Sequence, residues 1–256
     1  MLIDSHCHLD FEEYAGRIPQ ILEGMSRNQV THALCVSVNL ADFPRVLALA
    51  ERYPQLFASA GVHPDQPEGA SLGEDELLER AAHPKVLAIG ETGLDYFRLT
   101  GDLEWQRTRF RTHIRAALRC GKPLIIHTRD AGEDTLRIMR EEGAGRVGGV
   151  MHCFTETLAV AEAAMELNFL ISFSGIVTFK NAAALREVAK TIPLGKMLVE
   201  TDSPYLAPVP NRGKTNEPGW VRFVAEEIAR LHGVSLQAVA EATTANFFRL
   251  FKLDNI

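Results

Sequence analysis

Two histidines, His6 and His8, stand two residues apart near the N-terminus, at the end of a short apolar run. Side chains two positions apart on an extended strand point to the same face, so both imidazoles can reach one centre. Neutral imidazole is the commonest side-chain metal ligand in proteins. The spacing therefore predicts part of a metal site, with further ligands supplied from elsewhere in the chain.

Further candidate ligands follow other short apolar runs along the chain. They are Glu91, His127, His152 and Asp202. Carboxylates and imidazoles gathered in a protein interior lose hydration and repel one another, and divalent cations offset both effects. Six ligands exceed the three that usually hold one catalytic zinc, and they suit two metal ions bridged by a carboxylate. We predict two divalent ions per chain, with zinc, manganese, magnesium and iron all compatible with these ligand types.

A seventh candidate, His63, follows another apolar run and precedes Pro64. We expect it to act as a catalytic or substrate-contacting residue, although direct metal ligation and a purely structural role in the turn are alternatives. Four other histidines lie in or beside predicted helices or at the start of a run, and no role is assigned to them. They are His32, His83, His113 and His232.

These residues need a fold that brings the ends of distant runs together. The apolar runs lie at residues 2–3, 33–38, 56–62, 86–90, 123–126, 149–151, 169–173 and 197–199. Amphipathic stretches of helical period separate them, which is typical of parallel βαβ units. The count and the length predict an α/β fold, a (β/α)8 TIM barrel forming one domain over residues 1–256, with an extra C-terminal helix at 236–250. An open doubly wound sheet is the alternative, but no GxGxxG motif follows the first run.

Charge and cysteine content limit the possible partners and compartments. The net charge is −6, which excludes a broad basic face for nucleic acid and leaves only local cations or metals to bind phosphate. The four cysteines form no CxxC pair, which favours a reducing compartment. The N-terminus does not resemble a signal peptide, and no apolar run approaches the length of a membrane span. We expect a cytoplasmic protein without membrane contact and without an obligate protein partner.

Cations and one aromatic residue are expected on the loops that surround the site. Arg129 follows His127 by two residues, and Lys180 follows the seventh run, so both are predicted to bind substrate. Tyr205 is predicted to contact the substrate by stacking on a base, with burial beneath the loops as the alternative. Two long connections, 64–73 and 206–219, are expected on the same rim.

Two cysteines are each adjacent to a candidate ligand. Cys7 lies between His6 and His8, and Cys153 follows His152. Because side chains alternate along a strand, both thiols are expected to point away from the metal centre. A nucleophilic role is therefore not assigned to either.

Several motifs resemble those of the TatD family of metal-dependent deoxyribonucleases, which belongs to the amidohydrolase-like superfamily of (β/α) barrels. The motifs are Asp-Ser-His-Cys-His-Leu-Asp at 4–10, Gly-Val-His-Pro at 61–64, Ile-Gly-Glu-Thr-Gly-Leu-Asp at 89–95, Ile-His-Thr-Arg-Asp at 126–130, His-Cys-Phe at 152–154, Ser-Phe-Ser-Gly at 172–175 and Glu-Thr-Asp-Ser-Pro-Tyr-Leu at 200–206. The stretches at 174–179 and 206–210 resemble the YcfH branch especially. The resemblance runs from residue 2 to about residue 251.

The resemblance implies how the ligands divide between two metals. His6, His8 and Asp202 would hold one ion, His127 and His152 the other, and Glu91 would bridge them. It also implies a DNA substrate, single-stranded and degraded from the 3′ end.

The mechanism that we expect is attack of a metal-bound water on a phosphodiester. Asp202 would act as the base and Glu91 would bridge the ions, while His63 would contact the phosphate or protonate the leaving oxygen. An amide or ester hydrolase, such as a D-aminoacyl-tRNA deacylase, is the main alternative, because fold and metals do not fix the substrate. A metal-binding protein without catalysis is a third.

Overall fold

Eight parallel strands form one sheet in which each strand pairs with its neighbours in chain order. The computed structural model describes residues 1–66 and 72–253. The strands are β1 (Leu2–Cys7), β2 (Val30–Cys35), β3 (Leu56–Ala60), β4 (Val86–Asp95), β5 (Leu124–Arg129), β6 (Gly149–Met151), β7 (Phe169–Phe173) and β8 (Met197–Val199). Nearly all of their residues are buried, as expected for a parallel sheet covered on both faces.

The sheet closes on itself where β1 meets the chain that leaves β8. The backbone N–H of Asp202 donates to the carbonyl of His6 at 2.9 Å, and the N–H of His8 donates to Ser203 at 2.9 Å. Below them, the buried carboxylate of Asp4 accepts from the backbone N–H of Thr201 at 2.8 Å. Three predicted metal ligands, His6, His8 and Asp202, thus lie on the closing seam of the barrel.

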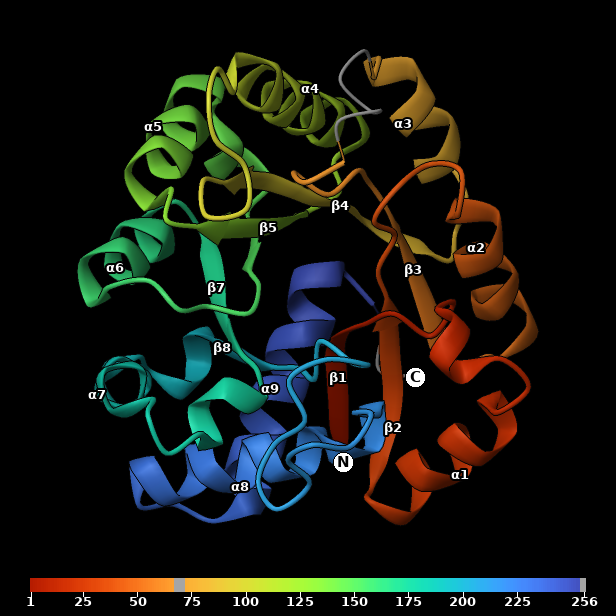
Figure 1. Ribbon diagram of the computed structural model, residues 1–256, viewed down its shortest axis with the longest axis vertical. Helices are drawn as coiled ribbons and strands as arrows, with labels where there is room; N and C mark the ends of the chain where they lie inside the picture. Colours follow the sequence, from red (N-terminus) through yellow and green to blue (C-terminus); the bar gives the residue numbers. More distant parts are fainter. Residues whose placement is uncertain (67–71, 254–256) are drawn as a thin grey trace.

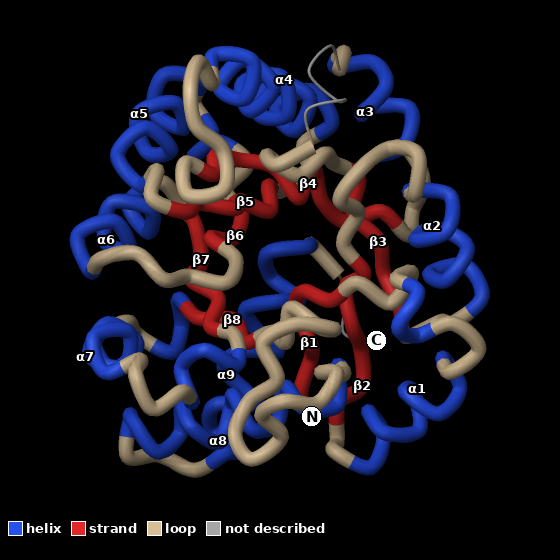
Figure 2. Tube along the Cα trace, in the orientation of Figure 1, coloured by secondary structure: helices blue, strands red, loops and turns tan. Residues whose placement is uncertain are grey.

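Helices surround the strands and complete the βαβ units. They are α1 (Ile18–Arg27), α2 (Phe43–Arg52), α3 (Glu74–Ala81), α4 (Glu104–Cys120), α5 (Gly132–Glu142), α6 (Leu158–Glu166), α7 (Ala183–Thr191), α8 (Val221–His232) and α9 (Leu236–Phe251). Figure 1 looks along the barrel and shows α1 to α8 as an outer ring. Figure 2 shows the strands inside that ring. The predicted (β/α)8 fold and its extra C-terminal helix are confirmed.

Apolar side chains fill the inside of the barrel, and α9 covers its N-terminal end. The inner cluster comprises Ile3, Leu34, Val36, Phe57, Leu87, Ala88, Ile125, Val150, Leu170, Leu198, Phe247, Phe248 and Phe251. The last three come from α9, which contacts β1 and β8. Burial of each of these rings contributes about 1.5–3 kcal/mol, so the helix is an integral part of the barrel core.

The predicted strand boundaries are right for some strands and short for others, and they are too long at the C-terminal ends of β2 and β3, which end at Cys35 and Ala60 instead of residues 38 and 62. The three strands from 149 to 199 begin and end as predicted, whereas β1, β4 and β5 extend several residues further. Glu91 and His127 consequently lie inside their strands rather than after them. Residues 67–71 of the predicted connection 64–73, and residues 254–256 of the predicted domain, lie outside the described residues.

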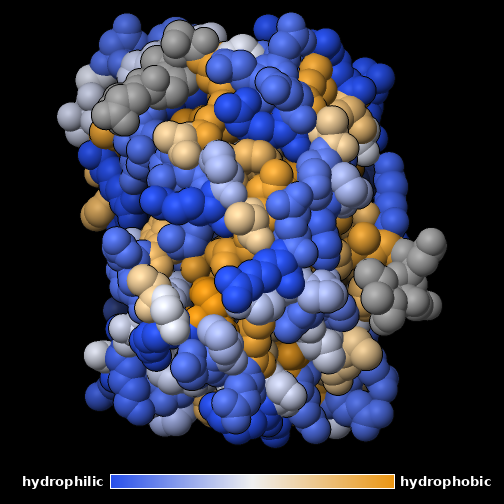
Figure 3. Space-filling model, turned by 90° about the vertical axis from the view of Figure 1, so that its right-hand side faces the viewer, coloured by the Kyte–Doolittle hydropathy of each residue, from blue (hydrophilic) through white to orange (hydrophobic). Residues whose placement is uncertain are grey.

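The outer face is hydrophilic, as the helical periodicity predicts. On the side formed by α1, α2 and α3, hydrophilic residues cover most of the surface and apolar residues show between them (Figure 3). Of the helices described, none combines the length and apolarity needed to cross a bilayer.

Candidate metal centre

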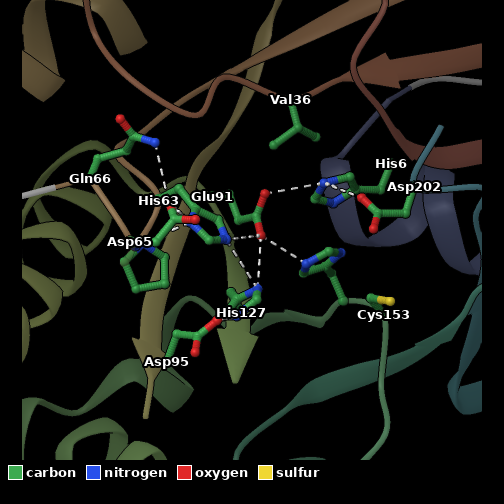
Figure 4. Close-up of polar contacts among 12 residues, drawn as sticks. His6, Val36, His63, Asp65, Gln66, Glu91, Asp95, His127, Cys153 and Asp202 are labelled. Carbon is green, nitrogen blue, oxygen red and sulfur yellow. Dashed lines mark hydrogen bonds and ion pairs between the residues drawn. The ribbon is translucent and has the colours of Figure 1, made fainter. Parts of the chain in front are cut away.

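Glu91 lies at the centre of the site, with imidazoles on both sides of its carboxylate (Figure 4). Its Oε2 is 3.3 Å from Nε2 of His6. Its Oε1 is 2.8 Å from Nε2 of His152 and 3.1 Å from Nδ1 of His127. The two oxygens of one carboxylate therefore face different groups of ligands.

The group on the β1 side consists of His6, His8 and Asp202. The Nε2 atoms of His6 and His8 are 3.3 Å apart, which confirms that the two rings point to one centre. Asp202 Oδ1 lies 3.4 Å from Nε2 of His8 and 3.7 Å from Nε2 of His6. The backbone hydrogen bond from Asp202 to His6 at the seam fixes these two residues relative to each other.

The group on the β5 side contains His127 and also His63. Nε2 of His63 is 3.3 Å from Glu91 Oε1 and 3.3 Å from Nδ1 of His127. His63, Glu91 and His127 together form a set that could hold a metal ion, as do His6, His8 and Glu91. His152 lies between the two sides, because its ring also stacks on that of His6 with centroids 3.9 Å apart.

Most of these imidazoles have their second nitrogen bound to an oxygen outside the centre. The pairs are His8 Nδ1 with the Val36 carbonyl (2.9 Å), His63 Nδ1 with Asp65 (2.5 Å), His127 Nε2 with Asp95 (3.0 Å) and His152 Nδ1 with Glu200 (3.1 Å). Each acceptor holds the N–H on its own side of the ring, so the lone pair of the other nitrogen faces the centre. Nδ1 of His6 is buried without a partner among the described residues.

Gly93 lies between Glu91 and Asp95 on β4 and allows this strand to approach β5 closely. A Cβ at this position would lie 2.0 Å from the carbonyl oxygen of His127, and the backbone φ of +138° is one that L-residues rarely adopt. Glu91, Gly93 and Asp95 alternate along one face of β4, so the glycine lets Glu91 and Asp95 contact the same ring from two sides.

The charges of the site fit a bound cation. Burial opposes ionisation of Glu91, yet the surrounding histidines, His152 and His63 foremost, hold the pKa of its carboxyl well below its usual range. Burial likewise opposes protonation of His152, but Glu91 and Glu200 raise its pKa well above normal. The buried carboxylates are thus stabilised by nearby positive charge. Bound metal ions would supply this charge in place of the protons on the histidines. Nε2 of His152 is buried and lies 2.8 Å from Glu91 Oε1 without the geometry of a hydrogen bond, as expected of an atom that binds a metal beside this carboxylate.

A cleft of about 650 Å³ opens above the centre at the C-terminal ends of the strands. Its described lining includes five of the six predicted ligands, while His6 lies buried beneath them. The lining also contains Tyr205, which is 52% exposed, and two arginines, Arg98 and Arg129. Arg98 donates to Asp65 Oδ2 at 2.6 Å, whereas the Arg129 guanidinium lies 3.8 Å from the centroid of the Phe97 ring.

Comparison with known proteins assigns the chain to a family of metal-dependent hydrolases. A family profile described as "TatD related DNase" matches residues 3–252. The chain belongs to the TatD family. It is 45% identical to a protein named as the uncharacterized metal-dependent hydrolase YcfH of Escherichia coli K12, over 99% of this chain and 96% of that protein. It is 42% identical to the Bacillus subtilis protein named as the uncharacterized metal-dependent hydrolase YabD, over 99% and 100%.

A solved structure agrees with this assignment. The TatD homologue YjjV of Escherichia coli K12 superposes with a TM-score of 0.91 at 30% identity, covering 99% of this chain and 98% of that one. The resemblance read from the motifs is therefore confirmed, and this TatD-family chain is a metal-dependent hydrolase. Among the described residues, three sets of side chains could hold a metal ion: His6, His8 and Glu91; His6, His152 and Asp202; and His63, Glu91 and His127.

The loop that carries His63 in this TatD-family protein rests on α4. The buried Arg109 donates to the carbonyls of His63 at 2.8 Å and of Pro64 at 3.1 Å. Gln106 also donates to Pro64, at 3.0 Å. His113, to which the sequence assigned no role, accepts a hydrogen bond from the N–H of Val62 at 3.0 Å. These residues fix the backbone from which His63 reaches the centre.

Two placements differ from expectation. Cys153 lines the cleft beside His152 instead of facing away, because its backbone φ of +43° breaks the alternation of an extended strand. Burial raises the pKa of its thiol well above the usual range, which is unfavourable for a nucleophile. Lys180 is exposed and is not among the described residues that line the cleft.

Sequence reasoning missed the carboxylates that orient the imidazoles. Asp95 and Glu200 both lie inside motifs recognised from the sequence, but only the ligands themselves were assigned there. A signal was present for Asp95, since it stands four residues after Glu91 and hence on the same face of a strand. Arg109 carried no such signal, because a cation on an amphipathic helix ordinarily lies at the surface.

Proposed function

We propose that the protein is a two-metal phosphodiesterase that removes nucleotides from the 3′ end of single-stranded DNA. The observation that carries the proposal is the division of the Glu91 carboxylate, with Oε2 toward His6 and Oε1 toward His127 and His152. A carboxylate placed between two groups of ligands suits a pair of divalent ions. The ligand sets proposed follow the family resemblance: His6, His8 and Asp202 for one ion, His127 and His152 for the other, with Glu91 shared.

Bound ions of this kind supply Lewis acidity and a water of lowered pKa. The protein's own groups would supply the remaining chemistry. Asp202 lies at the floor of the cleft, and neighbouring His8 keeps its carboxylate ionised by lowering its pKa against the effect of burial. It is therefore placed to accept the proton of an attacking water. His63, held by Asp65, would contact the phosphate or the leaving oxygen from the opposite side.

The shape and charge of the cleft favour a single strand over a duplex. The cleft holds about 650 Å³ at the mouth of a closed barrel, room for a chain end rather than for a helix. With a net charge of −6, affinity must come from the centre and from few cations. Arg129 supports phosphate binding, since its guanidinium makes no hydrogen bond or ion pair with a described residue, whereas Arg98 is already bound to Asp65. Tyr205 offers an exposed ring at the same mouth.

End-labelled oligonucleotides test this proposal directly. We expect successive loss of single nucleotides from a 3′ end in the presence of Zn²⁺, Mn²⁺, Mg²⁺ or Fe²⁺, with a 5′ label retained on a ladder of shortening products. A duplex of the same sequence should be cut more slowly. Turnover of esters, amides or D-aminoacyl-tRNA without any cleavage of DNA would reassign the substrate and leave the proposed metal centre intact.

A further inference from the structure

One exposed aromatic ring beside the cleft belongs to no part of the site described so far. Phe97 is 59% exposed, and it shares this property with only one other aromatic residue of the described chain, Tyr205. Tyr205 lines the cleft, and the Phe97 ring lies against the guanidinium of Arg129, which also lines it. A large aromatic side chain left in solvent at a binding site is a candidate contact for a ligand with a flat apolar face.

Phe97 is tied to the metal centre through Asp95. One oxygen of this carboxylate holds His127, and the other accepts the backbone N–H of Phe97 at 3.0 Å and of Arg98 at 2.8 Å. The same carboxylate thus orients a candidate ligand below it and fixes the turn that presents the Phe97 ring above it.

Arg129 continues this arrangement on the neighbouring strand. It pairs in register with Asp95 and stands two residues beyond His127, which is about 7 Å along a strand. His127 contacts Asp95, and one step further from the barrel Arg129 lies over Phe97. The ring holds one face of the guanidinium, and the N–H groups at its edge make no hydrogen bond to a described residue.

We propose that Phe97 and Arg129 form a subsite for the nucleotide next to the scissile phosphodiester, with the guanidinium on its phosphate and the ring against its base. The inference rests on the proposed function and adds to it a second phosphate contact and a base contact. Guanidinium suits phosphate because it donates two parallel N–H bonds. A benzene ring suits any base because every base has a π face, so the subsite takes all four nucleotides.

The subsite also explains a preference for single strands. The face of a base is covered by its neighbours in a duplex, and it becomes available to a protein ring only when the strand is unstacked. Phe97 therefore selects unpaired ends without reading sequence.

Three substrates separate the contacts to base and phosphate. The first is a twelve-residue oligothymidylate, and the second is the same oligonucleotide with tetrahydrofuran abasic residues at its last three positions. The third is methyl 4-nitrophenyl phosphate, a diester with neither a base nor a second phosphate. Phe97→Ala, Phe97→Tyr and Arg129→Gln are compared with the unaltered, metal-loaded enzyme, and the readout is the ratio of kcat/KM for the normal to the abasic oligonucleotide.

We expect this ratio to be about 5 to 100 in the unaltered enzyme, from the range of stacking strengths measured for aromatic side chains. Phe97→Ala should bring the ratio close to one, and Phe97→Tyr should restore it. Arg129→Gln should lower kcat/KM for both oligonucleotides alike and keep the ratio. Hydrolysis of methyl 4-nitrophenyl phosphate should stay within about twofold in the two Phe97 variants, because this substrate has no base for the ring to contact.

A ratio that Phe97→Ala leaves unchanged overturns the inference. Equal loss on all three substrates also overturns it, because the ring would then act only on the fold or on the centre. If the unaltered enzyme hydrolyses methyl 4-nitrophenyl phosphate but shows no preference for bases, the inference fails and the phosphodiesterase proposal stands. If it hydrolyses no diester, both fail.

Discussion

Asp95 accepts a hydrogen bond of 3.0 Å from Nε2 of His127, and this contact turns Nδ1 of the same ring toward Glu91 at 3.1 Å. His152 is held in the opposite sense, with Nδ1 on Glu200 and Nε2 toward Glu91. The tautomers of the two rings are therefore set by carboxylates that do not themselves face the centre. Removing such a carboxylate should act through the ring that it orients.

Asp95→Asn and Glu200→Gln should each weaken metal binding about 10- to 100-fold. The amide retains the size of the carboxylate but loses its charge, so the opposite nitrogen of the imidazole becomes a weaker ligand. Metal titration followed by calorimetry measures the change, with Glu187→Gln on exposed α7 as the control. Unchanged affinity in both variants would show that these carboxylates do not tune the site.

Glu91→Gln should weaken the binding of both metal ions and not of one alone. Because the carboxylate faces both groups of ligands, its loss weakens both positions at once. Elemental analysis of the purified variant should show fewer than one ion per chain, and hydrolysis should fall by a factor on the order of 1,000. A variant that retained two ions and half its rate would rule out a bridging role.

Removal of metal should lower stability as well as activity. Ions that bind only the folded chain stabilise it by about 2.7 kcal/mol when present at 100 times their dissociation constant. Dialysis against a chelator should therefore lower Tm and abolish turnover, and addition of a divalent ion should restore both. Comparison with Glu91→Gln, whose Tm should respond little to the chelator, assigns the effect to this centre.

Arg129→Gln should reduce the salt dependence of DNA binding. One phosphate contact to a single strand contributes about −0.7 to the slope of log affinity against log salt, so the slope should become shallower by that amount. Anisotropy with a labelled phosphorothioate oligonucleotide measures it without turnover. Lys180→Ala is the matched comparison and should change the slope less, because Lys180 does not line the described cleft. A larger change in the slope for Lys180→Ala than for Arg129→Gln would support the phosphate contact predicted for Lys180 from the sequence.

His113 should contribute to stability in a pH-dependent manner. Burial lowers its pKa to about 3, below the usual value of 6.5, so the folded protein holds the neutral ring. The contribution of the neutral His113 ring to the free energy of unfolding is complete above pH 6.5 and is lost as the pH falls toward 3. His113→Leu should cost about 1–3 kcal/mol at pH 7, because it leaves the N–H of Val62 unpaired. Urea unfolding should also show a flatter pH dependence between 6.5 and 4 than in the unaltered protein, with the partly exposed His83→Leu as control.

Much of the fold was predictable because it follows from short-range pattern. Apolar runs separated by helical periods define parallel βαβ units, and the barrel then brings the carboxyl ends of the strands together whatever lies between them. His6 and His8 needed only the two-residue alternation of a strand. These rules use backbone geometry that nearly all residues share.

The parts that failed depend on local departures from such rules. Cys153 adopts a positive φ, so alternation gave the wrong face. Lys180 follows β7 as predicted but is not among the described residues that line the cleft, so its contact with substrate stays a prediction. Arg109 is buried among carbonyls that belong to a loop more than 40 residues away, a contact that only the assembled barrel creates.

The apolar side chains that fill the barrel, with the phenylalanines of α9 at its N-terminal end, leave the cleft open at one end only. A polymer cannot be threaded through it, so the end that enters the cleft must retreat by the same route, and each released product leaves past the incoming strand. The rate at saturating substrate should then depend on the exchange of product and substrate through the single opening of the cleft. Long strands should be degraded distributively, with dissociation between cleavage events, rather than processively.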